Sequence, residues 1–480
     1  MSHPETKKSS MGLNRRDFLK VTGILGAGLA IAPTVLSEEA KNASKTVNVG
    51  FIGVGVQGRV LLTNALKIPN LRFVAVTDVW PYHQGYAVRL LKKYQHNANG
   101  YADHMEMLEK EKELDAVIIA TPDWKHAEHT IACLTAGKHV YCEKEMSNSL
   151  ELAKQMVVTS REAKKLLQIG HQRRSNPRYN KGFDFVAKKK CCGKLGFVSA
   201  QWNRAKRLDV GWPKDQELDA AALAKLGYDS MQKFRNWRWY KKFSGGPIAD
   251  LGSHQIDIFN WYIGASPRSV MASGGMDWSE GIEWYDNINA LYEWEVPADG
   301  GKKRIVRGFY QTLSFTSHGG YAETFIGDEG SLIISENATT GGIRREQEAP
   351  EAEWEKEFAK LKAAAAPAAA PAAPAAPAAP AAPAATEAGK PAPTKDDEGG
   401  IKVTHSVPAP GRYYPPIPAE PDAKSEHLPH IENFIAAVRE GAALNCPGEV
   451  GYDTAVTVLK VNEAVATQKR LEYTPEEFKA

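Results

Sequence analysis

The strongest constraint on the fold is a glycine-rich turn that joins a strand pattern to a helix pattern. The run "TVNVGFI" leads directly into Gly53, Gly55 and Gly58, spaced G-x-G-x-x-G, and a helical pattern follows. In this setting the first glycine permits a tight turn, the second lets a pyrophosphate approach the backbone, and the third allows close packing of helix and strand. The helix N-terminus then stabilises the anion. The turn predicts a dinucleotide site, and Val56 and Gln57 lie in the same turn.

An acidic residue after the turn selects between two dinucleotides. The next strand pattern, "LRFVAVTD", ends in Asp78, 20 residues past Gly58. A carboxylate at this place accepts hydrogen bonds from both ribose hydroxyls of an adenosine and repels a 2′-phosphate. NAD is therefore the expected cofactor and NADP is disfavoured. The alternative is a glycine turn that binds no nucleotide.

Two different patterns of secondary structure divide the chain into two parts. From residue 46 to about residue 170, short β-branched runs such as "DAVIIAT" and "KHVYCE" alternate with helical patterns, which is typical of βαβ units and a parallel sheet. After about residue 195, runs such as "FVSAQW", "NINALYEWEV" and "RIVRGFYQ" follow with few helices between them. We predict an α/β protein. Residues 46–171 form an N-terminal Rossmann dinucleotide-binding domain, and residues 172–480 form a C-terminal α+β domain for substrate binding and oligomerisation, with a large, mostly antiparallel open sheet.

A low-complexity tract interrupts the second domain. Residues 363–385 read "AAAAPAAAPAAPAAPAAPAAPAA". Such a tract cannot bury large side chains, and its prolines block both helix and sheet. We expect a disordered Ala/Pro-rich surface insertion at about residues 350–400, after which the domain resumes.

The N-terminal segment resembles a Tat signal peptide. Arg15 and Arg16 precede 16 uncharged residues, Val21 to Leu36, and small residues allow cleavage after Ser37. An uncleaved membrane anchor is the alternative, but 16 residues fall short of the roughly 20 that span a bilayer. The resemblance implies that residues 1–37 direct the folded protein through the Tat machinery to the periplasm or another exported location.

Composition excludes several other classes of function. Without residues 1–37 the chain has 55 basic and 55 acidic residues, so it offers no electrostatic case for binding nucleic acid. Five scattered cysteines are too few for a disulfide framework. The adjacent pair Cys191 and Cys192 is expected to be two packed or exposed thiols, and no metal site is expected.

Five stretches in order identify the chain as resembling the Gfo/Idh/MocA oxidoreductase family. They are "GFIGVGVQGR", "ATPDWKHAEHTIACLTAGKHVYCEKEMS", "GHQRRSNP", "SGGPIADLGSHQIDIFNW", and the closing pair "HIENFIAAVREG" and "EVGYDTAVTVLKVNEA". The resemblance covers about residues 46–345 and 425–480. It implies oxidation or reduction of a sugar or polyol and, in this family, frequent pairing of chains through the open sheet.

The second and fourth stretches contain the expected catalytic groups. Lys144 ends a strand of the parallel sheet, where it can donate a hydrogen bond to a substrate hydroxyl, as the family's lysine does. Asp250 and His254 lie four residues apart and would share a helix face with Asp257. The family's catalytic Asp and His correspond to Asp250 and His254, whereas Asp257 is expected to have a structural role. The family usually has proline at the position of Glu145. This difference puts the orientation of the Lys144 side chain in question.

The resemblance also implies further contacts. His126 is expected to pack on the cofactor side, and Gln172 to face the cofactor. The other expected cofactor contacts are Thr121, Pro122, Glu143 and Lys144. Arg173 or Arg174 is expected at the substrate mouth, and Trp239 and Tyr240 are either core aromatics or a surface for a sugar ring.

We therefore expect an exported NAD-dependent oxidoreductase that acts on a CH–OH group of a sugar, polyol or sugar derivative. Its cofactor is expected to be tightly bound, because it must be loaded before export. One alternative is a glycosidase or lyase that oxidises a sugar hydroxyl transiently. The other is a non-catalytic sugar-binding protein, against which the intact Lys144, Asp250 and His254 speak. The expected partners are a small carbohydrate or polyol, the Tat machinery and further copies of the chain.

Overall fold

The computed structural model describes residues 45–205, 210–356, 411–417 and 425–480. The predicted export signal and the Ala/Pro-rich tract lie outside the described residues. Within the described ranges, no helix combines the length and apolar character needed to cross a membrane.

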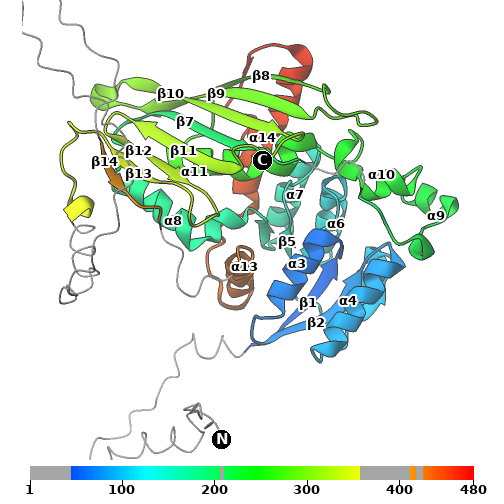
Figure 1. The fold of residues 1–480 in the computed structure, drawn as a ribbon. Helices are drawn as coiled ribbons and strands as arrows, with labels where there is room; N and C mark the ends of the chain where they lie inside the picture. Colours follow the sequence, from blue (N-terminus) through cyan, green and yellow to red (C-terminus); the bar gives the residue numbers. More distant parts are fainter. Residues whose placement is uncertain (1–44, 206–209, 357–410, 418–424) are drawn as a thin grey trace, which may run out of the picture. The chain divides into compact units, whose positions relative to one another are not determined.

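The first domain contains a six-stranded parallel sheet with strand order β3-β2-β1-β4-β5-β6. β1 is buried along almost its whole length because helices cover both faces of the sheet. Figure 1 shows α3 and α4 beside β1 and β2. The elements are β1 Val47–Ile52, α3 Val56–Ala65, β2 Leu71–Thr77, α4 Pro81–Lys93, β3 Asn99–Tyr101, α5 His104–Lys110, β4 Ala116–Ile119, α6 Asp123–Thr135, β5 His139–Cys142, α7 Leu150–Ala163 and β6 Leu167–Ile169.

The second domain contains a nine-stranded sheet with order β14-β13-β12-β11-β7-β10-β9-β8-β15. Every described pair is antiparallel except β7 with β10. The strands are β7 Leu195–Trp202, β8 Ser269–Gly275, β9 Asn287–Pro297, β10 Lys303–Leu313, β11 Tyr321–Gly327, β12 Gly330–Ile334, β13 Gly342–Arg345, β14 Arg412–Tyr414 and β15 Leu471–Glu472. The predicted fold class is confirmed; the short strands β3, β13, β14 and β15 were not among the predicted runs.

One face of this large sheet is packed and the other is partly open. Buried and less buried residues alternate along β9 and β10, and α11 and α14 contact the packed side. Apolar side chains that remain 37 to 48% exposed are Phe197, Met271, Leu291, Ile326 and Ile333. The helical elements of this part of the chain are η1 Gln172–Ser175, α8 Pro177–Phe183, η2 Asp184–Lys188, η3 Lys214–Gln216, α9 Ala220–Lys225, α10 Met231–Arg235, η4 Trp237–Trp239, η5 Ile248–Gly252, α11 Ser253–Ile263, η6 Asp299–Gly301, α13 Leu428–Glu440 and α14 Gly448–Thr467.

Helix α13 returns to the first domain. It contacts α3, β1 and β5, and Ile431 and Phe434 join the core beneath the parallel sheet. Figure 1 shows α13 beside α3. The C-terminal segment therefore completes the nucleotide-binding domain, which a division of the chain at residue 171 does not include.

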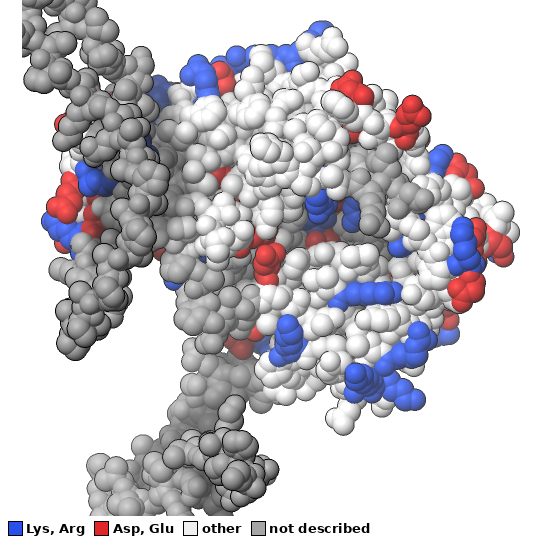
Figure 2. Space-filling view, in the orientation of Figure 1, with Lys and Arg blue, Asp and Glu red and all other residues white. Residues whose placement is uncertain are grey.

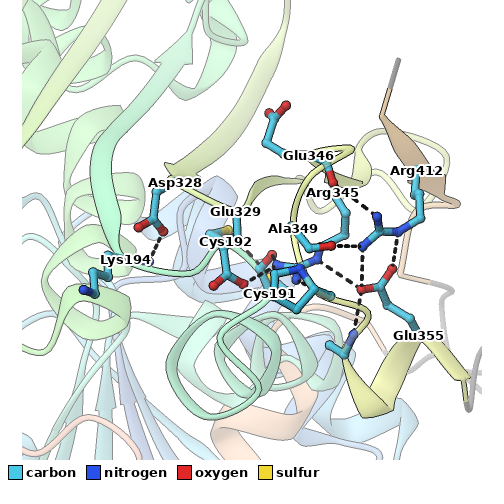
Figure 3. Close-up of polar contacts among 12 residues, drawn as sticks. Cys191, Cys192, Lys194, Asp328, Glu329, Arg345, Glu346, Ala349, Glu355 and Arg412 are labelled. Carbon is cyan, nitrogen blue, oxygen red and sulfur yellow. Dashed lines mark hydrogen bonds and ion pairs between the residues drawn. The ribbon is translucent and has the colours of Figure 1, made fainter. Parts of the chain in front are cut away.

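Paired strands flank the Ala/Pro-rich insertion. β13 and β14 lie antiparallel, and Arg412 of β14 donates to Glu355, which also contacts Arg345 of β13 (Figure 3). Burial alone would raise the pKa of Glu355, but hydrogen bonds from Arg412, the Ala352 amide and Tyr414 outweigh it and lower the pKa to about 2. These contacts fix the two ends of the inserted segment to one sheet.

The five cysteines are all buried free thiols. Cys191 and Cys192 have their sulfur atoms 3.6 Å apart, and the Cys191 carbonyl accepts a hydrogen bond from Arg345 (Figure 3). The adjacent pair is therefore packed inside the protein.

Candidate active site

A cavity of about 1240 Å³ extends from the glycine-rich turn to helix α11. It exceeds the roughly 300–1000 Å³ of most small-molecule pockets, so it has room for a dinucleotide and a second small molecule. Near its centre, the face drawn in Figure 2 is hollowed, and basic and acidic side chains lie in the hollow. The expected cofactor contacts that line the cavity are Gly53, Gly55, Val56, Gln57, Asp78, Thr121, Pro122, His126, Glu143, Lys144 and Gln172.

The glycines of the turn have three different roles. Gly53 adopts φ +87°, which side chains rarely tolerate. A Cβ on Gly58 would lie 2.1 Å from the Gly53 carbonyl oxygen, so Gly58 serves the packing of helix and turn and does not line the cavity. A Cβ on Gly55 would meet nothing nearer than 4.0 Å. Gly55 therefore keeps open the space through which a pyrophosphate approaches the N-terminus of α3.

The nucleotide end of the cavity fits an adenosine. Asp78 accepts hydrogen bonds from the Val54 amide at 2.7 Å and the Trp80 amide at 2.9 Å, which fix its carboxylate at the cavity wall. Val56 and Val79 also line the cavity and are 76% and 42% exposed. Apolar side chains this exposed at the mouth of the turn offer surfaces that a bound nucleotide would cover.

Lys144 and Asp250 meet at the other end of the cavity. The Lys144 ammonium donates to the Asp250 backbone carbonyl at 2.6 Å and lies 3.8 Å from its carboxylate. β5 brings Lys144 to the carboxyl edge of the parallel sheet, and the π-helical turn η5 brings Asp250 from the second domain. The two side chains are only 11% and 15% exposed, so their charges interact in a partly dry environment.

His254 lies on α11 beside the same cavity. Burial and the nearby cations Lys144 and Arg173 keep the pKa of His254 well below its ordinary value, so the ring is neutral at neutral pH. Its Nδ1 atom is buried and has no hydrogen-bond partner among the described residues. Trp202 packs 5.5 Å from the imidazole and stacks on Tyr321. A neutral imidazole held by aromatic packing can accept a proton.

Two expected cofactor-side residues brace the loops of the cavity. The ring nitrogens of His126 lie 2.6 Å from the Glu145 carbonyl oxygen and 2.7 Å from that of Thr121. Gln57 donates to Glu143 at 3.3 Å. These contacts link the glycine-rich turn and the β4–α6 connection to the loop that contains Lys144.

Glu145 is a buried carboxyl that follows Lys144 in the chain. It is 2% exposed, and its Oε1 atom accepts a hydrogen bond from the Met146 amide at 2.8 Å. The peptide bond between Lys144 and Glu145 is cis. Burial raises the pKa of Glu145 to about 8, and burial also raises the pKa of Asp123 to about 7. Both residues line the cavity, so it contains carboxyl groups that are wholly or partly protonated near neutral pH.

The structure does not bring the two expected substrate arginines to the cavity. Arg173 is buried between Glu323 and Glu336. The Arg174 guanidinium donates to both carboxylate oxygens of Asp257 at 2.7 to 2.9 Å, and the Thr454 hydroxyl also donates to Asp257. Among the cavity-lining residues of the described chain, neither arginine occurs. Asp257 has the structural role expected of it.

The two expected aromatic residues both belong to a buried cluster that also contains Trp80 and Tyr228. Trp239, which is 3% exposed, also lines the cavity, whereas Tyr240 does not.

Several cavity residues were missed by sequence reasoning. Trp202 on β7, Arg204 in the loop after it and Arg238 on η4 line the cavity. The sequence pattern marks the first segment only as a strand and the second as a source of rings and cations, without singling out these three residues. A further group lies at the nucleotide end, where the ligand atoms of His104, Glu128 and His129 are within 4.8 Å of one another and could hold a metal ion. Glu128 and His129 are neighbours on α6, and His104 begins α5, so only the packing of α5 against α6 completes this group.

Comparisons with known proteins agree with this arrangement. Residues 47–171 match the family model described as "Oxidoreductase family, NAD-binding Rossmann fold", and residues 192–332 match the Gfo/Idh/MocA C-terminal domain. The inositol 2-dehydrogenase of Rubrobacter xylanophilus is 30% identical over 233 residues, 48% of this chain and 56% of that protein. The myo-inositol 2-dehydrogenase of Thermotoga maritima is 25% identical over 230 residues, 48% of this chain and 59% of that protein. The chain thus spans less than two thirds of the length of these curated relatives.

Solved structures share the fold. The WlbA dehydrogenase of Chromobacterium violaceum, in complex with NADH and UDP-GlcNAcA, has a TM-score of 0.60 at 18% identity, over 90% of this chain and 97% of that one. Levoglucosan dehydrogenase in complex with NADH has a TM-score of 0.59 at 17% identity, over 90% and 100%. The first domain is a NAD-binding Rossmann fold, and the chain belongs to the Gfo/Idh/MocA family of oxidoreductases.

Proposed function

We propose that this protein is an exported NAD-dependent oxidoreductase that oxidises a CH–OH group of a sugar, polyol or sugar derivative. The observation that carries the proposal is the convergence of Lys144, Asp250 and His254 on the cavity that begins at the NAD-binding turn. The dehydrogenases among the relatives support the sugar or polyol as substrate.

The chain's own residues supply the proton chemistry. Lys144 donates a hydrogen bond to the reacting hydroxyl oxygen and stabilises the negative charge that develops there. Asp250 positions Lys144 through its backbone carbonyl. Neutral His254 accepts the hydroxyl proton. The glycine-rich turn and Asp78 would hold NAD, which would supply the hydride acceptor for this chemistry.

Export and tight cofactor binding belong to the same proposal. The twin arginines Arg15 and Arg16 support passage of the folded protein through the Tat machinery, and a chain that leaves the cytoplasm has to take its NAD with it. We also propose that copies of the chain associate, which the partly exposed apolar residues on the open face of the second sheet support.

A substrate panel tests the activity. Purified protein is incubated with sugars, polyols and glycosides while the absorbance of bound reduced nicotinamide and the release of free sugar are followed. Reduction of bound NAD by at least one sugar or polyol is the expected result. If no compound in the panel reduces the bound NAD, the proposal is contradicted.

A second candidate is a glycosidase or lyase that oxidises a hydroxyl transiently. Asp123 and Glu145 favour it, since protonated carboxyl groups in the cavity could donate a proton to a leaving group. This candidate predicts sugar release from a glycoside without lasting accumulation of NADH.

A further inference from the structure

Among the residues that the structure describes, cations outnumber carboxylates at the catalytic end of the cavity. Around the Asp250 carboxylate lie Lys144 Nζ at 3.8 Å, Arg238 Nε at 3.2 Å and Arg204 Nη2 at 3.8 Å. All three basic residues line the cavity. One carboxylate cannot neutralise three cations, so this group leaves a local excess of positive charge.

The neighbouring carboxyl groups do not cancel this excess. Burial raises the pKa of Asp123 to about 7 and that of Glu145 to about 8, so both are wholly or partly neutral near neutral pH. Glu336 is ion-paired with the buried Arg173 at 3.0 Å. The other acidic residues that line the cavity form no ion pair with Lys144, Arg204 or Arg238 in the described part of the chain; they are Asp78, Asp103, Glu128, Glu143 and Glu426.

Arg204 and Arg238 lie on the open side of this cluster. Their side chains are 49% and 43% exposed, against 11% for Lys144. A guanidinium has five N–H donors, and the contact of each arginine with Asp250 uses only part of that capacity. Arg238 also stacks on Trp237 at 4.2 Å, which restricts its orientation. Two guanidinium groups therefore face the cavity with donors available to another acceptor.

We propose that the substrate carries an anionic oxygen group, a carboxylate or a phosphate, which Arg204 and Arg238 bind next to the hydroxyl that reacts at Lys144. Planar guanidinium groups match both oxyanions through paired hydrogen bonds. A neutral sugar would leave the positive charge of this cluster without a counter-charge. The inference rests on the proposed oxidoreductase function and narrows its substrate to acidic sugars or polyols.

Matched pairs of substrates test it. With NAD-loaded protein, kcat/KM is measured for glucose against glucuronate, galactose against galacturonate, and each hexose against its 6-phosphate. We expect the acidic member to exceed the neutral one by about tenfold or more. A preference for uronates identifies a carboxylate ligand, and a preference for the phosphates identifies a phosphate ligand.

Arginine variants locate the effect. In Arg204→Gln with Arg238→Gln the ratio of acidic to neutral kcat/KM should fall towards one, whereas Arg304→Gln, on strand β10 outside the cavity, should leave it unchanged. Rising ionic strength should lower the ratio in the unaltered protein. Equal rates for both members, or a preference that survives in the double variant, would overturn the inference while the proposed oxidoreductase function stands.

A binding measurement separates the two proposals if no pair is oxidised. Glucuronate and inorganic phosphate are titrated into NAD-loaded protein by calorimetry, with the double variant and Arg304→Gln in parallel. Binding that is lost only in the double variant supports the anion site even where oxidation fails. Absence of binding of both anions to the unaltered protein would refute it.

Discussion

Replacement of Lys144 by Met tests the catalytic assignment most directly. The side chains are similar in length, but the change removes the ammonium that donates to the Asp250 carbonyl at 2.6 Å. A cation about 3 Å from a developing negative charge, in an effective dielectric of about 20, stabilises that charge by about 5 kcal/mol at most. Mutational data for positioned acid–base groups give about 10²–10⁴ in rate. We therefore expect turnover to fall by about a hundredfold or more.

The assay follows single-turnover reduction of bound NAD with a confirmed substrate, so that product release does not mask the chemical step. NAD affinity should change much less than turnover, because Asp78 and the glycine-rich turn provide the nucleotide contacts. Lys154→Met is a matched control, since Lys154 is an exposed lysine whose ammonium contacts only the Lys479 carbonyl in the described part of the chain. Full turnover in Lys144→Met would refute the catalytic role of the lysine.

Four further predictions address the cofactor, the fold and export. Asp78→Ala should weaken retention of NAD through gel filtration, and stoichiometric NADP released from purified protein would contradict the preference for NAD. Gly58→Ala should abolish NAD binding measured by calorimetry, because its Cβ would lie 2.1 Å from a backbone oxygen. Glu355→Gln should lower the free energy of unfolding by about 2 kcal/mol at pH 7. The folded-state pKa of Glu355 is depressed to about 2, so its contribution is present above its ordinary pKa near 4.5 and should disappear in denaturant titrations as the pH falls from about 5 towards 2. Residues 1–45 should export a folded reporter, and replacing Arg15 and Arg16 by Lys should stop export; unchanged export in a strain without the Tat translocase would count against the signal.

Local sequence was sufficient to predict the first domain and its glycine-rich cofactor turn. The parallel strands are short, apolar and β-branched, and the turn itself requires glycine at Gly53, which has φ +87°, and at Gly58, whose Cβ would meet the Gly53 carbonyl oxygen. The motif order also singled out Lys144, Asp250 and His254, and all three line one cavity in the structure.

The roles of Arg173 and Arg174 could not be predicted from local sequence in the same way. Arg173 and Arg174 are adjacent in sequence, yet Arg173 pairs with Glu323, 150 residues away, and Arg174 with Asp257, 83 residues away. Both pairings exist only after β11 and α11 pack on the 172–175 segment. A sequence pattern records that two cations are present but not which carboxylates neutralise them.

The sequence by itself determined the class of fold, the cofactor and the candidate catalytic residues, because those depend on short-range geometry and on a shared order of motifs. Tertiary structure alone decided that α13 returns to cover the parallel sheet, that β13 and β14 pair across the insertion, and that Arg204 and Arg238 meet at Asp250. These contacts depend on how distant segments pack. Burial and charge, which set the pKa of each group and the chemistry of the cavity, arise only from that packing.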